Sequence, residues 1–342
     1  MRLGLNVGYA TDDLGSLVRL VERAEQLGVA SAWAAEAYGT DAVSVLAYLA
    51  AHTSRMRLGS AVLQIPARTP AMTAMTAITL DHLSEGRFAL GLGVSGPQVV
   101  EGWHGVPYGR PLGRSREYVA IVRTILARQE KLDFHGEHYR IPYDGDDGLG
   151  LGKPLRSMAH PLRSDLPILL AAIGPRNVHL AGEIADGWLP HLYSPTHERV
   201  LTDQLDLGIA AAGRTADEVE IVASVAVGLD DDLDAARDQV RPWLALYIGG
   251  MGARDRNFYT DLVRRYGWEQ VADTVQDHYL DGRRDDAAAA IPDALVDELA
   301  LVGPAERIAD RLDAWRESRV TELVLRVDDV DVLTRIVQAA AG

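Results

Sequence analysis

Short apolar runs alternate with amphipathic stretches along most of this chain. The apolar runs are continuous, which is typical of parallel strands that are buried on both faces. We predict eight strands: Leu3–Val7, Ala30–Ala35, Leu58–Leu63, Phe88–Gly93, Pro167–Ile173, Gly187–Leu189, Glu220–Val227 and Glu322–Val327. A helical pattern follows each strand, and this repeated order predicts a (β/α)8 TIM barrel. The alternative is an open doubly wound sheet, which would usually have fewer strands and a separate second domain.

Two segments interrupt this alternation, at about 131–165 and at 249–303. The first contains a predicted hairpin at Leu132–Tyr139 and a Gly/Asp-rich stretch, and the second contains several helical pieces. No linker or internal repeat divides residues 1–342. We therefore expect a single domain with two insertions, which should cover the barrel mouth.

Residues 57–96 form a strand–helix–strand unit. Thr69 is placed to cap the helix, Pro70 suits its first turn, and Gly86 follows its end. Since both strands are parallel, their carboxyl ends open side by side. Ligands bind at such ends in α/β proteins.

The second strand of this unit runs into Gly91-x-Gly93-x-x-Gly96, the spacing of a dinucleotide fingerprint. The context argues against that interpretation, because three strand–helix units precede it and the next clear helix is expected only from Ser115. The acidic residue at the required distance, Glu117, falls inside that helix. We interpret the glycines as a loop whose missing side chains let a flat ligand approach the backbone.

A second candidate ligand-binding turn follows the fifth strand, and its sequence is Gly174-Pro175-Arg176-Asn177. Pro175 suits the first turn of a helix, whose free N–H groups and partial positive charge attract anions. The guanidinium of Arg176 adds several N–H donors that can bind an anion. From these residues alone, a phosphate site and an ordinary loop with a surface arginine are equally good interpretations.

Charge and composition exclude several functions. The chain has 34 basic and 49 acidic residues, a net charge of −15, and no basic cluster. Nucleic acids and anionic membranes are therefore not expected as partners. The absence of cysteine excludes disulfides, thiolate catalysis and Cys-ligated metals. We expect no metal, because His135 and His138 lie in the predicted hairpin and not on an HExxH helix.

The sequence also indicates where the protein is located in the cell and gives three further candidate site residues. No signal peptide and no apolar run of about 20 residues is evident, so we expect a cytoplasmic protein. Glu36 follows the second strand, and because Asp41 is better placed to cap the next helix, Glu36 is free for a site. His104 and Trp103 follow the glycine loop, where a substrate and a cofactor could meet.

Several segments together resemble the coenzyme F420-dependent oxidoreductases of the luciferase-like superfamily. They span nearly the whole chain: AAEAYGTD, LGSAVLQIPARTPAMTAMTAITLDHLSEGRFALGLGVSG, EGWHGVPYGRPLGR, AAIGPRNVHLAGEIADGWLP, LYIGGMGARDRNFYTDLVRRYGW and LVGPAERI. The segment Thr79–Arg87 is shared across the superfamily and does not identify the cofactor. The resemblance implies an interrupted TIM barrel, a cofactor at its C-terminal face, and a homodimer.

The resemblance also implies a cofactor site. A cis peptide bond between Ala61 and Val62 should press against the deazaflavin ring, and the Gly174 turn should hold its phosphate. The cofactor contacts implied in this way are Glu36, Ala61, Val62, Gln64, Gly93, Ser95, Gly96, Gly174, Pro175, Arg176 and Asn177. Several family members have a histidine after the acidic residue of strand two, where this chain has Ala37.

Our leading hypothesis is hydride transfer from reduced F420 to a C=C, C=N or C=O group of a small molecule or peptide. His104 and Glu36 are the first candidates for proton delivery, with Tyr38 and His191 behind them. One alternative is an FMN-dependent monooxygenase on the same barrel. Another is a non-catalytic deazaflavin-binding protein, which Ala37 supports slightly.

Overall fold

A closed parallel barrel forms the centre of the molecule. The computed structural model describes residues 1–8 and 13–341. The barrel strands are β1 (Arg2–Asn6), β2 (Ser31–Ala34), β3 (Arg57–Ser60), β4 (Leu63–Gln64), β5 (Phe88–Gly93), β8 (Ile168–Ala171), β9 (Gly187–Leu189), β10 (Glu220–Leu229) and β12 (Glu322–Arg326). They pair in this order, β3 and β4 sharing one position, and parallel pairing of β12 with β1 and of β9 with β10 closes the ring. The predicted (β/α)8 barrel is confirmed.

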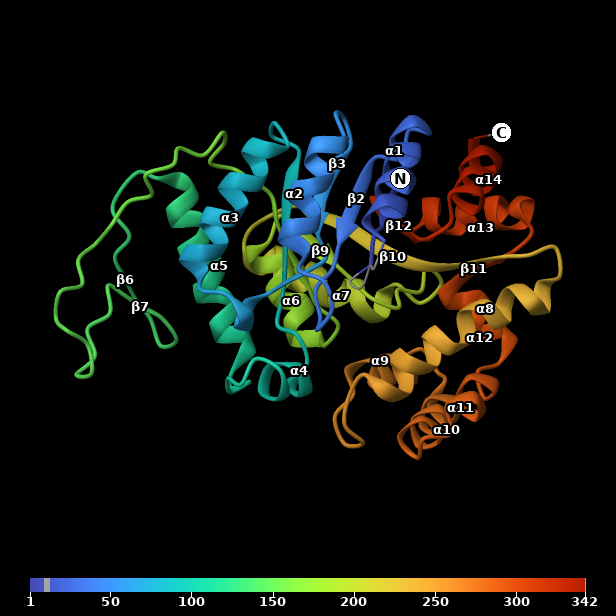
Figure 1. Cartoon of the computed structure of the whole chain (residues 1–342). Coiled ribbons are helices and arrows are strands. Elements are labelled where there is room, and N and C mark those ends of the chain that lie inside the picture. The colour runs from blue at the N-terminus through green and yellow to red at the C-terminus, as the bar shows by residue number, and fades with distance from the viewer. Residues whose placement is uncertain (9–12, 342) are drawn as a thin grey trace.

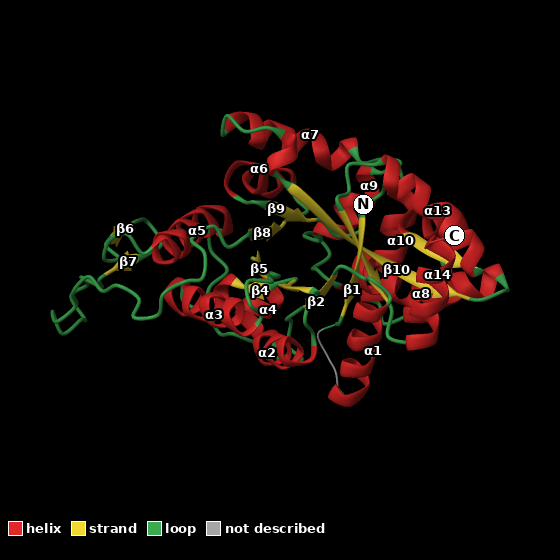
Figure 2. Ribbon diagram, turned by 90° about the horizontal axis from the view of Figure 1, so that it is seen from above, coloured by secondary structure: helices red, strands yellow, loops and turns green. Residues whose placement is uncertain are grey.

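Helices surround the strands, as Figure 2 shows from above. They are α1 (Leu14–Gln26), α2 (Ala42–His52), α3 (Pro70–Leu83), α5 (Pro111–Ala127), α6 (Pro175–Ile184), α7 (Arg199–Ala211), α8 (Leu233–Ala245), α13 (Ala305–Glu317) and α14 (Val330–Ala341). Thr69 caps α3 by accepting from the Met72 amide, and Pro70 opens the helix, as predicted. Short 3-10 turns lie at Ile65–Ala67 and Ala216–Glu218.

The structure corrects the expected elements around the glycine loop. A short helix, α4 (Pro97–Gly102), begins directly after Gly96, where no helix was expected before Ser115. The next helix, α5, begins at Pro111. Proline is well tolerated at the first helical position, so both Pro97 and Pro111 start a helix. The predicted lack of a helix directly after the glycine loop was therefore wrong, and it does not argue against the dinucleotide fingerprint. The position of the loop after the fourth strand of the barrel, and not after the first, still argues against it.

The first insertion projects from the barrel as an arm, at the left of Figure 1. It contains the predicted hairpin, which consists of β6 (Phe134–His135) and β7 (Arg140–Ile141). Apolar side chains on this arm, such as Leu149 and Met158, are exposed. The arm therefore lies away from the barrel core.

The second insertion folds as a group of helices beside the barrel mouth. It consists of the π-helical turn η3 (Leu246–Gly250), α9 (Phe258–Arg265), α10 (Glu269–Leu280), α11 (Arg284–Ala289) and α12 (Asp293–Leu299). A strand that the sequence analysis missed, β11 (Ala300–Gly303), follows them and pairs with the last residues of β10. β10 continues past its barrel partners to reach this strand, so one strand serves both the barrel and the insertion.

Apolar side chains fill the barrel interior below the mouth. This inner cluster contains Trp33, Ala89, Leu169, Leu189, Val222 and Val324. The ring of Trp33 packs on Gly59, where a Cβ atom would lie 2.2 Å from the indole. The indole N–H donates to the buried Glu322 carboxylate at 2.7 Å. Among the described residues, no helix is both long and apolar enough to cross a membrane.

Candidate active site

A cavity of about 960 Å³ opens at the carboxyl ends of the strands. Every strand position of the barrel contributes residues to its lining, and Trp33, Leu189, Val222 and Val324 form its floor. Its volume lies at the upper end of the range for small-molecule and cofactor sites. The mouth of this barrel is therefore the candidate active site.

One side of the cavity is built from backbone and small side chains, and we call it the glycine wall. It consists of Ala61, Val62, Gly93, Ser95, Gly96 and Gly174. The Ala61–Val62 peptide bond is cis, as the family resemblance implied. A Cβ atom on Gly93 would lie 2.5 Å from Val62 Cγ2, so this glycine makes room for the neighbouring strand. Flat ligands can approach such a wall closely.

The strand behind the glycine wall leaves no space for larger residues. Ser60 Oγ accepts a hydrogen bond from the Gly91 amide at 2.9 Å and donates to the Gly91 carbonyl at 2.8 Å. A Cβ atom on Gly91 would lie 1.9 Å from the Ser60 carbonyl oxygen. Gly91 is thus required for the close packing of β3 and β5.

The N-terminus of α6 lies at the edge of the glycine wall. Gly174 is its N-cap and no described side chain caps the helix, while Pro175 occupies its first position. The Asn177 and Val178 amides donate back to the Gly174 carbonyl at 2.9 and 3.0 Å. The exposed Arg176 stands at this end and also lines the cavity. A positive helix end beside a guanidinium suits a phosphate.

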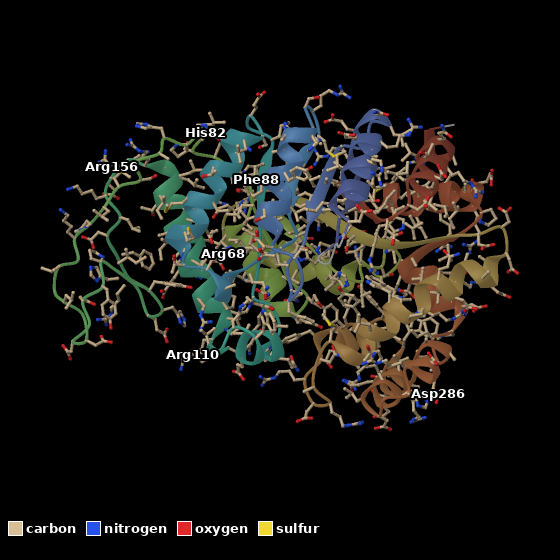
Figure 3. All side chains as sticks on the ribbon, viewed as in Figure 1. Arg68, His82, Phe88, Arg110, Arg156 and Asp286 are labelled. Atoms are coloured by element: carbon tan, nitrogen blue, oxygen red, sulfur yellow. The ribbon has the colours of Figure 1, made fainter. Side chains whose placement is uncertain are left out.

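Glu36 lines the cavity but is not free. Arg68 donates to its two carboxylate oxygens, with both N–O distances 2.6 Å, and the Ala42 amide donates at 3.2 Å. Asp41 caps α2 as predicted, and it also contacts Arg68. The expectation that capping by Asp41 releases Glu36 is therefore wrong, because both carboxylates serve the start of α2. Figure 3 shows Arg68 well inside the molecule, whereas Arg110, Arg156 and Asp286 lie at its edge.

His104 and Gln64 lie behind the cavity. Neither is among the lining residues, and Gln64 is almost completely buried. His104 Nε2 is 3.3 Å from Gln64 Oε1, and Gln64 Nε2 donates to the Ala37 carbonyl at 2.8 Å. The two residues thus form a series of hydrogen bonds that ends at the loop after strand β2. The other ten residues predicted to contact the cofactor all line the cavity.

Another side of the cavity is aromatic. We call His191, Trp243, Tyr247 and Tyr259 the aromatic wall. The ring centroids of Tyr247, Trp243 and Tyr259 lie 4.2, 5.3 and 5.4 Å from that of His191. Burial, together with the positive charge of Arg326, lowers the pKa of His191 to about 3. This histidine is therefore neutral at physiological pH.

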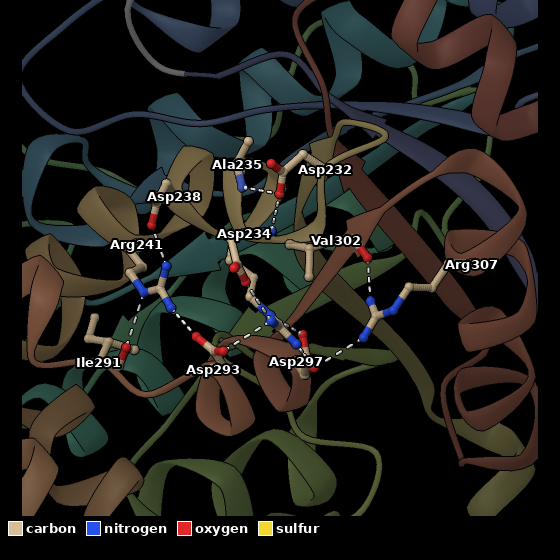
Figure 4. A network of polar contacts seen from close by, with 11 residues as sticks. Asp232, Asp234, Ala235, Asp238, Arg241, Ile291, Asp293, Asp297, Val302 and Arg307 are labelled. Carbon is tan, nitrogen blue, oxygen red and sulfur yellow. Dashed lines mark hydrogen bonds and ion pairs between the residues drawn. The ribbon is translucent and has the colours of Figure 1, made fainter.

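Charged side chains fix the helix that carries Trp243. Arg237 on α8 pairs with Asp297 at 2.8 Å and with Asp293 at 3.0 Å, and Arg241 also contacts Asp293. Arg307 on α13 reaches Asp297 as well, at 3.0 Å. Figure 4 shows this network between α8, α12 and α13. The aromatic wall is therefore attached through ion pairs of the second insertion.

The cavity carries more positive than negative charge, although the chain as a whole is acidic. Its lining includes Arg176, Arg256 and Arg326, and within residues 1–8 and 13–341 none of the three has an ion-pair partner. The carboxylate of Glu36 is offset by Arg68. We detect no cluster of metal-ligating side chains among the described residues. The site is thus suited to an anionic organic ligand.

Comparisons with known proteins agree with this geometry. The sequence model of the luciferase-like monooxygenases matches residues 1–322. The chain belongs to the luciferase-like monooxygenase family. A Mycobacterium tuberculosis protein, provisionally named a coenzyme F420-dependent oxidoreductase, is 47% identical over 95% of this chain and 94% of its own length. The 5,10-methylenetetrahydromethanopterin reductase of Archaeoglobus fulgidus is 28% identical, covering 89% and 87%.

Solved structures of two F420-dependent enzymes have the same fold. The coenzyme F420-dependent tetrahydromethanopterin reductase of Methanopyrus kandleri superposes with a TM-score of 0.82, at 21% identity, over 99% of this chain and 98% of its own. An F420-dependent secondary alcohol dehydrogenase, solved with an F420–acetone adduct, gives a TM-score of 0.78 at 16% identity, with coverage of 99% and 98%. At these identities the likeness concerns the fold.

The sequence analysis missed most of the aromatic wall. Trp243 comes from α8, and Tyr247 and Tyr259 come from the second insertion. None of the three matches a short catalytic motif, and of the wall only His191 was named. The position of Arg326 in the sequence could have identified it as a candidate site residue. It occupies the carboxyl end of the last strand, where barrel enzymes place functional side chains.

Proposed function

We propose that this protein is an F420-dependent oxidoreductase that transfers a hydride between the cofactor and a C=C, C=N or C=O group of a small molecule or peptide. One observation carries the proposal: the glycine wall and the α6 N-terminus face one cavity, as a flat ring and its phosphate require. The M. tuberculosis relative supports the cofactor assignment.

The residues present fit this cofactor. Gly93 and Gly96 leave the wall without side chains where a ring must lie flat, and a Cβ atom at Gly174 would meet only Phe258, at 3.9 Å. Arg176 and the helix end would bind the phosphate. When bound, F420 supplies a ring carbon that donates or accepts a hydride. The protein must hold the acceptor within about 3–3.5 Å of that carbon and exclude water.

We propose Glu36 for proton delivery and His104 for positioning the loop after strand β2 that carries Glu36. Glu36 lies at the cavity surface, whereas His104 would act through Gln64 and is a positioning residue. In both Glu36→Gln and His104→Ala, kcat should fall far more than F420 affinity. His104→Gln should recover part of the loss, since an amide can still donate to Gln64. Unchanged turnover in Glu36→Gln and His104→Ala would contradict this assignment.

A titration with two cofactors tests the proposed function. The purified protein is titrated with F420 and with FMN, and binding is followed by quenching of tryptophan fluorescence. We expect F420 to bind and to be oxidised or reduced when a substrate is added. Tight binding of FMN without binding of F420 would instead favour the monooxygenase. Binding of F420 without turnover of any substrate would favour a non-catalytic binding protein.

We also propose that the enzyme is a cytoplasmic homodimer. The support is a set of exposed apolar side chains on the neighbouring helices α2 and α3: Tyr48, Met72, Met75 and Leu83. Sedimentation velocity should give twice the chain mass. Met75→Glu should lower the dimer fraction, whereas a monomeric wild-type protein would contradict the proposal.

A further inference from the structure

Arg326 lies across the barrel mouth from the glycine wall. It ends β12, and in the closed barrel β12 is separated from β5 by β1, β2 and β3 on one side and by β10, β9 and β8 on the other. The glycine loop follows β5, and the proposed phosphate site follows β8. A ligand bound by Arg326 is therefore separate from the ring that would lie against Gly93.

The guanidinium of Arg326 has no anionic partner among the described residues. It lies over the ring of Trp243, with its central carbon 5.3 Å from the ring centroid. This contact holds the side chain in place and leaves its N–H donors available to the cavity that it lines. In a chain with 49 acidic residues, an unpaired arginine in a cavity is a candidate for binding an anion.

His191 provides a second polar group on the same side. Its half-buried ring lines the cavity, and its buried Nε2 atom has no hydrogen-bond partner among the described residues. Nδ1 is 3.5 Å from the Ser224 hydroxyl. A buried polar atom without a partner is costly, so a ligand atom that pairs with Nε2 would recover that free energy.

The remaining surface between these two groups is aromatic. Trp243, Tyr247 and Tyr259 surround His191, and the ring centroids of Trp243 and Tyr247 are 4.9 Å apart. Aromatic faces and edges at this spacing pack well against a planar, unsaturated body. Arg326, His191 and the three rings therefore form one continuous surface.

We infer that the substrate is an anion with a planar, apolar body. Arg326 binds its carboxylate or phosphate group, the aromatic wall packs against its body, and His191 Nε2 forms a hydrogen bond with a polar atom of it. The assignment of this ligand as the substrate rests on the proposed function, because the cofactor would occupy the glycine wall. The binding surface itself is independent of the cofactor's identity.

Binding of matched acids and esters tests the inference. Cinnamate, methyl cinnamate and phenyl phosphate are titrated by calorimetry into the wild-type protein, with and without saturating F420. We expect one of the anions to bind about 10- to 100-fold more tightly than the ester, which is the range for a charge-assisted hydrogen-bonded pair. The comparison of cinnamate with phenyl phosphate identifies which oxyanion fits.

Variants of Arg326 make the test specific. Arg326→Gln should abolish the preference for the anion and leave binding of the ester unchanged, and Arg326→Lys should restore part of the preference. Arg156→Gln is the matched control, because Arg156 is exposed on the arm and far from the cavity. Equal binding of acid and ester by the wild type, or no binding of either anion, would overturn the inference.

The cofactor titration separates the two proposals. All Arg326 variants should bind F420 with wild-type affinity. A loss of F420 affinity in Arg326→Gln would assign this arginine to the cofactor and overturn the inference. If F420 fails to bind the wild type while the anion preference depends on Arg326, the proposed function is wrong and the anion site stands.

Discussion

The two walls of the cavity are built and fixed in different ways. The glycine wall follows barrel strands, and Gly91 and Gly93 let neighbouring strands pack without side chains between them. The aromatic wall comes from α8, the second insertion and the loop after β9, and its helix α8 is attached by ion pairs such as Arg237–Asp297. One wall is therefore fixed by backbone packing inside the barrel, and the other by side chains outside it.

This difference predicts where the molecule tolerates change. A side chain added to the strands behind the glycine wall meets backbone atoms that cannot move independently, so the barrel itself is affected. A side chain changed on the aromatic wall alters the cavity surface, while the barrel strands keep their register. Four experiments test this contrast, from the largest expected effect to the smallest.

Gly91→Ala should produce the largest effect. Its Cβ would lie 1.9 Å from the Ser60 carbonyl oxygen and 2.8 Å from Leu189. We expect a loss of about 3 kcal/mol in the free energy of unfolding, which is the upper range for overpacking. Urea denaturation measures it. Gly102→Ala is the control, because nothing lies within 4 Å of the added atom, and it should be nearly neutral. Equal stability of the two variants would refute the role of backbone packing.

Arg176→Gln should weaken cofactor binding and leave stability unchanged. Loss of a charge-assisted contact to phosphate should raise the Kd for F420 by about 30-fold, or about 2 kcal/mol. Fluorescence titration measures this affinity. Arg199→Gln is the control, since Arg199 is exposed at the start of α7, and its Kd should match the wild type. If Arg176→Gln binds F420 with the Kd of the wild type, the cofactor phosphate does not lie beside Arg176 at the α6 N-terminus.

His191 should make the stability of the protein sensitive to acid. The unfolded histidine binds a proton below about pH 6.5, whereas the buried one, with a pKa of about 3, does not. Between these values the unfolded state holds more protons, so stability falls as the pH falls. The loss from this group should be about 1.4 kcal/mol at pH 5.5, relative to pH well above 6.5.

The variant His191→Gln should remove this part of the pH dependence. Urea denaturation at pH 7.5 and 5.5 gives the change in the free energy of unfolding between the two pH values for each protein. The change in the wild type minus the change in the variant is the contribution of His191. The exposed His160 supplies the control, and His160→Gln should keep the wild-type slope. The same slope in all three proteins would mean that His191 is protonated in the folded state.

Gly93→Ala should lower stability much less than Gly91→Ala, because its Cβ meets a side-chain methyl group of Val62 and not a backbone atom. We expect a loss below about 1 kcal/mol. Val62 must turn away, however, and F420 affinity should fall by about 5- to 10-fold through the altered wall. If F420 binds this variant as tightly as the wild type, the ring does not lie against Gly93.

The sequence predicted the barrel and the glycine wall because both depend on local patterns. Continuous apolar runs identify buried parallel strands, and glycines at a strand end indicate close approach of a ligand. The limits of β5 and β9 were predicted correctly, and helix α3 began at Pro70 as its cap required. The cis bond between Ala61 and Val62 was expected only from the family resemblance, since no pattern of side chains specifies a cis bond. The third strand, predicted as Leu58–Leu63, is divided there into β3 and β4.

The aromatic wall could not be predicted in the same way. Trp243 and Tyr247 are a helical turn apart, which is equally typical of a helix packed into a core. Their position at the cavity depends on α8 docking to α12 and α13 through Arg237 and Arg307, residues far apart in the sequence. Glu36 shows the same limit, because its partner Arg68 is 32 residues away.

The continuation of β10 beyond the barrel has a consequence for how such enzymes diversify. β11 runs parallel to β10 and pairs with its last residues, so residues 230–299 leave and rejoin the fold at two neighbouring strands. A segment with closely spaced ends can be exchanged for another without moving the flanking strands. Transplanting it between relatives would then exchange Trp243, Tyr247 and Tyr259 together, while Arg326, His191 and the glycine wall stay with the barrel.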